Sequence, residues 1–262
     1  IVSQSDKDTN LVVFNFPNFH VSESFRLIRT NIDFFTKVND DNDGKVIMVT
    51  STISGEGKTF CSLNIASVSA IAQKKTVLVG FDLRKPKLNN IFDFNNDKGI
   101  TSYIIGKHSI EDIIQPSKYD NLDIILSGPI PPNPGELIES HKTKELIDYL
   151  KQKYDYIVID SPPIGFISDS LILLKYIDMC VYILRYDLSQ KSSVDYLNKL
   201  KEDYKIKTMG IIFNGYQYKY YMKDSYSYPP SYYSYYNTYY GSYVSSDDKS
   251  SKPRFWNKLF KS

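Results

Sequence analysis

Six short runs of aliphatic and β-branched residues, separated by segments with helical spacing, constrain the fold of this chain more than any other feature. The runs are apolar at consecutive positions, so both faces of each strand must be buried. Such strands alternating with helices predict an open α/β sandwich, in which a parallel sheet is covered on both sides. The predicted strands cover 46–50, 76–80, 122–126, 156–160, 179–184 and 209–213, and the predicted helices that follow them cover 58–72, 134–153, 169–176 and 189–204.

The two ends of the chain differ from this central pattern. Residues 1–20 predict an irregular lead-in, and residues 21–37 a helix with Ser22 as its N-cap. Residues 21–215 are predicted to form one domain. From residue 216 onward, Tyr, Ser, Asn, Pro and Gly dominate without any period that could bury a face, so residues 216–262 predict a disordered tail.

Tyrosine and charge are unevenly distributed along the sequence. Thirteen of the 23 tyrosines lie between Tyr216 and Tyr243. The tail from residue 216 carries seven Lys or Arg and three Asp, a net charge of +4, whereas the rest of the chain carries −2. A basic field this weak argues against nucleic acid as a partner.

The first predicted strand runs into Ser51-Thr-Ile-Ser-Gly55-Glu-Gly57-Lys58-Thr59, and a predicted helix follows. A glycine-rich turn between a strand and a helix is the setting of a phosphate-binding loop, because backbone N–H groups and the helix N-terminus can surround an anion. Lys58 is expected to reach the β- and γ-phosphates of ATP, or the β-phosphate of ADP, and the Thr59 hydroxyl to bind Mg²⁺. The first glycine of the usual G-x-x-x-x-G-K-[ST] pattern is replaced by Thr52, so an ordinary glycine-rich turn remains an alternative. The predicted nucleotide contacts in this loop are Ser54, Gly55, Glu56, Gly57, Lys58, Thr59 and Phe60.

Three further strands end in polar side chains. Asp160 ends the strand at 156–160, and Asp82 and Arg84 follow the strand at 76–80. Ligands of open α/β sheets bind at the carboxyl ends of the strands, so we predict that Thr59, Asp82 and Asp160 hold one Mg²⁺ beside the phosphate loop. Asn214 ends the last strand and could read the adenine edge, with capping of a turn as an equal alternative.

Together these motifs resemble the bacterial tyrosine kinase family, the cytoplasmic domains of polysaccharide co-polymerases, which belong to the MinD/ParA-like branch of P-loop proteins. The resemblance covers about residues 20–243. It implies that the helix bearing Glu23, Arg26 and Arg29 docks on a neighbouring subunit of a ring, an octamer in the family. A solvated helix face is the alternative for these three charges.

The resemblance also implies a protein-tyrosine kinase that phosphorylates its own tail in trans. Asp82 would then accept the phenolic proton, Arg84 would stabilise charge, and Lys58 and Asp160 would complete the catalytic set. The family's second acidic motif usually has two carboxylates, whereas this chain has Gly80 at the first position. The implied phosphoacceptors are Tyr226, Tyr228, Tyr232, Tyr233, Tyr235, Tyr236, Tyr239, Tyr240 and Tyr243.

Further expectations concern partners and location. The resemblance implies regulation of exopolysaccharide or capsule synthesis and export at the cytoplasmic face of the bacterial inner membrane. The expected partners are a transmembrane activator or co-polymerase region upstream of Ile1 and a cognate tyrosine phosphatase. Two other functions stay open: a MinD/ParA-like ATPase switch that passes phosphate to water, and an interaction module that binds nucleotide without chemistry.

Overall fold

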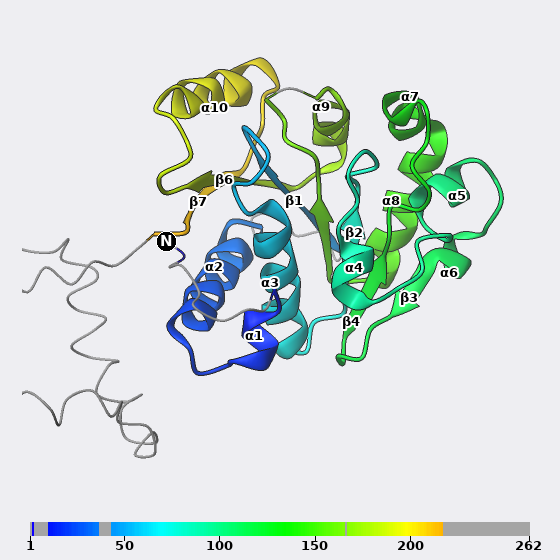
Figure 1. The fold of residues 1–262 in the computed structure, drawn as a ribbon, viewed down its shortest axis with the longest axis horizontal. Helices are drawn as coiled ribbons and strands as arrows, with labels where there is room; N and C mark the ends of the chain where they lie inside the picture. Colours follow the sequence, from blue (N-terminus) through cyan, green and yellow to red (C-terminus); the bar gives the residue numbers. More distant parts are fainter. Residues whose placement is uncertain (1, 3–9, 37–42, 166, 217–262) are drawn as a thin grey trace, which may run out of the picture. The chain divides into compact units, whose positions relative to one another are not determined.

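The computed structural model describes residues 2, 10–36, 43–165 and 167–216, which contain one seven-stranded sheet (Figure 1). The strand order is β3-β4-β2-β5-β1-β6-β7. All neighbouring strands are parallel except the edge strand β3, which runs antiparallel to β4. The strands are β1 (Lys45–Ser51), β2 (Thr76–Gly80), β3 (Ile114–Pro116), β4 (Leu122–Ile125), β5 (Tyr156–Asp160), β6 (Met179–Arg185) and β7 (Met209–Asn214). All six predicted strands are confirmed to within one residue at each end, whereas β3 was not predicted.

Helices cover both faces of the sheet (Figure 1). The first face carries α1 (Val12–Asn15), α2 (His20–Thr36), α3 (Lys58–Ile71) and α4 (Leu88–Phe92). The second carries α5 (Ile100–Ile104), α6 (Ile110–Ile113), α7 (Pro134–Glu139), α8 (His141–Lys153), α9 (Asp169–Leu173), the 3₁₀ helix η1 (Leu174–Tyr176) and α10 (Ser192–Asp203).

The central strand β1 shows why the apolar runs predicted two covered faces. Ile47 and Val49 pack into the core cluster that contains Phe25 of α2. Met48 points the other way, into the cluster that contains Leu146 of α8. Because successive side chains of a strand alternate between faces, an uninterrupted apolar run is needed to bury both.

Four predicted features are corrected by the structure. The helix expected over 134–153 is interrupted at Ser140, whose ψ of 153° is extended, so α7 and α8 are separate helices. The helix expected from residue 189 begins at Ser192. Ser22 is not an N-cap, since α2 already begins at His20. The lead-in is not wholly irregular, because α1 lies within it.

One buried amide side chain joins the lead-in to the domain. Asn64 of α3 accepts a hydrogen bond from the Val13 N–H at 3.1 Å and donates one to the Asn10 carbonyl at 2.7 Å. Among the described residues, no helix has the length and apolar character required to cross a membrane. The predicted tail lies outside the described residues, apart from Tyr216.

Candidate functional site

The loop between β1 and α3 has the backbone geometry of a phosphate-binding turn. Gly55 and Gly57 have φ of 93° and 96°, left-handed values that other residues rarely adopt. A Cβ on Gly57 would lie 2.1 Å from the Asn214 amide nitrogen. The 14-residue helix α3 begins directly after Gly57, so its free N–H groups and positive dipole end face the turn. This arrangement can hold the phosphates of a nucleotide.

The Lys58 ammonium is held at this loop. Its side chain is buried, with the residue 8% exposed, and its nitrogen donates to the Ser51 hydroxyl at 3.2 Å. Burial lowers the pKa of Lys58, and the nearby carboxylates of Asp160, Asp82 and Glu56 oppose that shift, in this order. Three acids therefore lie close enough to Lys58 to act on it. The buried ammonium can pair with an anionic ligand at this loop, and the three carboxylates offset part of its charge.

Asp160 faces the start of α3 and provides the strongest indication of a metal site. The Thr59 hydroxyl donates to Asp160 Oδ2 at 2.8 Å. Within the described part of the chain, the buried Oδ1 atom has no hydrogen-bond partner. Burial raises the pKa of this carboxyl to about 6, although the Thr59 bond and the Lys58 charge lower it. A buried carboxylate oxygen without a partner fits direct or water-mediated binding of Mg²⁺.

The metal would need the nucleotide as well as the protein. No group of three or more His, Cys, Asp or Glu side chains in the described ranges could hold a metal ion. Mg²⁺ in nucleotide sites is usually held by one or two protein oxygens, phosphate oxygens and water, so Thr59 and Asp160 fit that pattern.

The second acidic motif lies in the same electrostatic field. Asp82 raises the pKa of both Lys58 and Asp160, so its carboxylate lies near them. Asp82 Oδ1 accepts a hydrogen bond from the Lys85 N–H at 2.9 Å. Gly80 pairs with Asp160 in the sheet register. The position at which the family has its first carboxylate therefore lies directly beside β5.

The space at Gly80 is tight. A Cβ there would lie 3.1 Å from Leu88 Cδ1 and 3.2 Å from the Ser127 hydroxyl, which also donates to the Gly80 carbonyl at 2.8 Å. A side chain at this position would therefore require Leu88 or Ser127 to shift by a few tenths of an ångström.

Arg84 has a partner that the sequence pattern did not indicate. Its guanidinium makes two hydrogen bonds to Asp169, Nε to Oδ2 at 2.8 Å and Nη2 to Oδ1 at 3.0 Å. Asp169 is fully buried in the first turn of α9. The pair therefore ties the loop that carries Asp82 to the second helical layer, and Arg84 is engaged in the structure of that loop.

Asn214 lies against the phosphate loop. Its side-chain nitrogen donates to the Glu56 carbonyl at 3.0 Å, and the residue is 7% exposed. The Asn214 amide thus supports the loop, and recognition of adenine by the same side chain remains a prediction. Ser54 is exposed at the tip of the loop, whereas the Phe60 ring packs against Phe25 with centroids 5.8 Å apart.

Sequence reasoning missed several residues of this site. Ser51 and Asp169 hold Lys58 and Arg84, and Lys87 is near enough to lower the pKa of Lys58. Lys87 has a local signal, because it belongs to the Arg-Lys-Pro-Lys stretch after β2. Asp169 lies 85 positions from its partner, and no local sequence pattern predicts a pair so far apart.

The predicted interface charges lie on α2. Glu23 and Arg26 form an ion pair at 2.7 Å, and Arg26 also donates to the Pro17 carbonyl at 2.6 Å. Arg29 lies 4.0 Å from Asp33, which is bonded to the hydroxyl of Tyr156. These contacts are within one copy of the chain, and docking on a second copy remains a prediction. The predicted phosphoacceptor tyrosines all lie outside the described residues.

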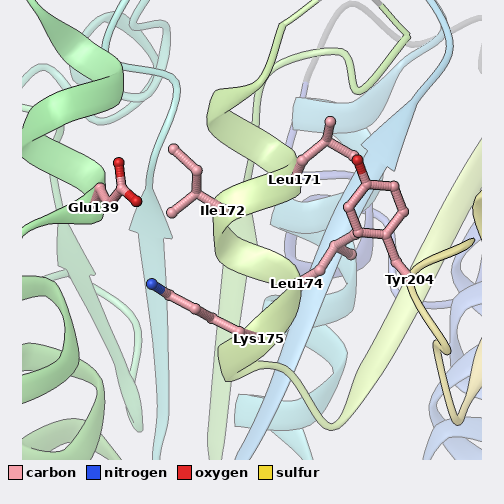
Figure 2. Close-up of a pocket in the computed structure, with 6 residues that line it drawn as sticks. All are labelled: Glu139, Leu171, Ile172, Leu174, Lys175 and Tyr204. Atoms are coloured by element: carbon pink, nitrogen blue, oxygen red, sulfur yellow. The ribbon is translucent and has the colours of Figure 1, made fainter.

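A separate pocket of about 320 Å³ lies between α7, α9, η1 and the end of α10 (Figure 2). Ile172 and Lys175 face the Glu139 side of this region, whereas Leu171 and Leu174 point toward Tyr204. None of the residues of the phosphate loop lines it.

Comparison with known proteins places these features in a family. Residues 44–181 match the family model described as an AAA domain. Tyrosine-protein kinase YwqD of Bacillus subtilis (strain 168) is 37% identical over 206 residues, which span 79% of this chain and 86% of that protein. The crystal structure of the chimerical protein CapA2B2 has a TM-score of 0.75 at 31% identity, over 82% of this chain and 92% of that one.

A more distant match concerns the fold alone. The cell division ATPase MinD of Pyrococcus furiosus has a TM-score of 0.57 at 21% identity, over 72% of this chain and 77% of that one. The predicted MinD-like α/β fold is therefore confirmed. With the phosphate loop and the acidic strand ends in place, this chain belongs to the family of bacterial tyrosine-protein kinases built on a MinD-like P-loop fold.

Proposed function

We propose that this chain binds ATP with Mg²⁺ at the β1–α3 loop and transfers the γ-phosphoryl group to tyrosines of its own C-terminal segment. The observation that carries the nucleotide site is the meeting of Lys58, Thr59 and Asp160, with one buried Asp160 oxygen left for a cation. Membership of the tyrosine-protein kinase family supports the choice of acceptor.

The backbone N–H groups from Ser54 to Phe60 would surround the phosphates. Lys58 would neutralise charge that develops on the transferred group, and its buried position strengthens that effect because local screening is weak. Bound Mg²⁺ would offset the charge of the phosphates. Thr59 and Asp160 would hold the ion, with Asp82 near it.

The transfer itself needs a tyrosine hydroxyl in line with the γ-phosphorus. The phenolic oxygen forms a bond to that phosphorus as the bond to the β,γ-bridging oxygen breaks, which leaves ADP. Asp82 is the proposed acceptor of the phenolic proton, because it is partly exposed beside Lys58 and Asp160. Arg84 is assigned a different role from the one expected from sequence: through Asp169 it holds the loop that carries Asp82.

Transfer in trans within a ring is part of the same proposal. The tail carries a net charge of +4 and its tyrosines are clustered. Each phosphotyrosine adds about −1.5 to −2 charge, so two modifications would nearly neutralise the tail and three would reverse its sign. A cationic tail would enter a phosphate-lined site on a neighbour, whereas a phosphorylated tail would be repelled and loosen the ring.

The proposed setting follows from the family. The ring, an octamer, would lie at the cytoplasmic face of the bacterial inner membrane and regulate the synthesis and export of exopolysaccharide or capsule. It would respond to a transmembrane activator or co-polymerase region and to a cognate tyrosine phosphatase. The charges at Glu23, Arg26 and Arg29 are the proposed ring contacts.

An immunoblot for phosphotyrosine tests the proposal, with wild type compared with Lys58→Met after incubation with ATP and Mg²⁺. Signal on wild type and its loss from the variant are expected. If γ-labelled phosphate appears in solution and none on tyrosine, the chain is an ATPase switch. Binding of ATP without release or transfer of phosphate would identify a nucleotide-binding module.

A further inference from the structure

Side chains at the end of β6 and in the turn that follows it make hydrogen bonds to the phosphate loop. The Ser189 hydroxyl is bonded to Glu56 Oε1, and Glu56 Oε2 accepts the Ile53 N–H at 2.8 Å. The same Ser189 oxygen accepts the Arg185 N–H at 2.7 Å. A continuous chain of hydrogen bonds therefore runs from the end of β6, through Ser189 and Glu56, into the start of the phosphate loop.

Two further contacts fix the carbonyls of the same loop. Arg185 Nη1 donates to the Gly55 carbonyl at 2.7 Å, and Asn214 donates to the Glu56 carbonyl at 3.0 Å. In a planar trans peptide the C=O and the following N–H point in opposite directions. Holding the carbonyls of Gly55 and Glu56 outward therefore turns the N–H groups of Glu56 and Gly57 away from these contacts, toward the inside of the loop.

Glu56 places a negative charge inside a loop that is proposed to bind phosphate. The residue is fully buried, in a loop whose proposed ligand is anionic, and its carboxylate also acts on Lys58. A negative charge at this position works against phosphate binding by Coulomb repulsion. Its benefit must therefore lie in the hydrogen bonds that it accepts from Ile53 and Ser189.

We infer that the side chains of Glu56, Arg185 and Ser189 form a clamp, the β6-turn clamp, that positions the backbone N–H groups of the phosphate loop without themselves touching the nucleotide. This inference rests on the proposed function, because it assigns positioning residues to the same site. The clamp joins segments more than 125 positions apart in the sequence, so the shape of the phosphate loop depends on the turn after β6.

The clamp makes a specific prediction about Glu56. Glutamine keeps an acceptor oxygen for the Ile53 N–H and has an amide that can donate to the Ser189 oxygen, yet it carries no charge. Glu56→Gln should therefore bind ADP within about threefold of wild type, whereas Glu56→Ala should bind at least about tenfold more weakly, the effect of losing a hydrogen bond to a charged group.

Calorimetric titration of ADP into purified Ser189→Ala tests the clamp directly. We expect this variant to bind ADP about tenfold more weakly than wild type. Its phosphorylation rate at saturating ATP should stay within about threefold of wild type, because the clamp acts on the affinity for nucleotide. Glu56→Ala and Ser189→Ala should not be additive in the double variant, because they break one chain of bonds. Ser192→Ala, an exposed serine three positions along, is the matched control and should bind ADP as wild type does.

Each result decides between the clamp and its alternatives. Unchanged ADP binding by Ser189→Ala, additive effects in the double variant, or a Glu56→Gln variant as weak as Glu56→Ala would each overturn the clamp while the nucleotide site stands. Absence of ADP binding by wild type would instead overturn the proposed function. Circular dichroism and a melting curve identify any variant that fails to fold, and Ser189→Ala and Glu56→Gln, which change the fewest atoms, then decide the question.

Discussion

Replacing Arg84 by alanine separates a structural role for this residue from a catalytic one. The guanidinium makes two hydrogen bonds, at 2.8 and 3.0 Å, to a carboxylate whose side chain is 0% exposed. In Arg84→Ala, Asp169 would remain buried without its cation. Breaking a buried pair in this way costs about 3–5 kcal/mol. Because the Arg84 side chain is 43% exposed, water can partly replace it, and we expect a loss of about 2–3 kcal/mol in the free energy of unfolding.

Urea unfolding at neutral pH measures this loss, with Lys85→Ala as the control. Lys85 is an exposed cation of the same loop, so its removal should change the free energy of unfolding by no more than about 0.5 kcal/mol. The double variant Arg84→Ala, Asp169→Asn should recover most of the stability lost in Arg84→Ala, because no charge is then left buried without a partner.

Activity is measured on the same proteins. ADP affinity should fall much less in Arg84→Ala than in Lys58→Met, since Arg84 contacts Asp169 and not the phosphate loop. If Arg84→Ala is as stable as Lys85→Ala but loses phosphotyrosine formation, the guanidinium acts in catalysis and the structural assignment is wrong.

Two other perturbations follow from the site. Burial raises the pKa of Asp160 to about 6, above its usual 3.8, so the stability contributed by its neutral form is complete below about pH 4 and is lost as the pH rises through 6. Asp160→Asn cannot ionise at this position, so its stability should not fall in this way. In EDTA, the unfolding free energy of Asp160→Asn minus that of wild type should therefore rise by about 1.4 kcal/mol from about pH 5 to pH 7.5. An equal pH dependence of the two proteins would contradict this. Gly57→Ala places a Cβ 2.1 Å from the Asn214 amide nitrogen, on a residue whose φ is 96°. The substitution should therefore lower the free energy of unfolding by about 1–3 kcal/mol and weaken ADP binding. Wild-type values in calorimetry and melting curves would refute the requirement for a left-handed turn at this position.

The fold was predictable where the sequence signal is local. The apolar runs gave the bounds of six strands because both faces of each strand are buried, as Ile47 and Met48 show on β1. The break at Ser140 was missed because residues on both sides of it have helical spacing. The edge strand β3 has only three residues and no buried one, so its sequence lacked the apolar signal.

The site was predictable to the extent that it lies at strand ends. Lys58, Thr59 and Asp160 meet as the parallel sheet requires. The supporting contacts could not be predicted in this way, because each joins residues that are distant in the sequence. Ser189 reads as the start of a helix, yet it bonds to Glu56, 133 positions away. Such partners follow from the packing of loops at one edge of the sheet and leave no periodic pattern.

The central claim is that Lys58, Thr59 and Asp160 surround one metal–nucleotide complex. Calorimetric titration of ADP in the presence and absence of Mg²⁺, for wild type and Asp160→Asn, tests it most directly. Mg²⁺ should tighten ADP binding to wild type and have little effect on the variant, in which the unpartnered carboxylate oxygen has lost its charge. An equal effect of Mg²⁺ on both proteins, or no binding of ADP by wild type, would contradict the account.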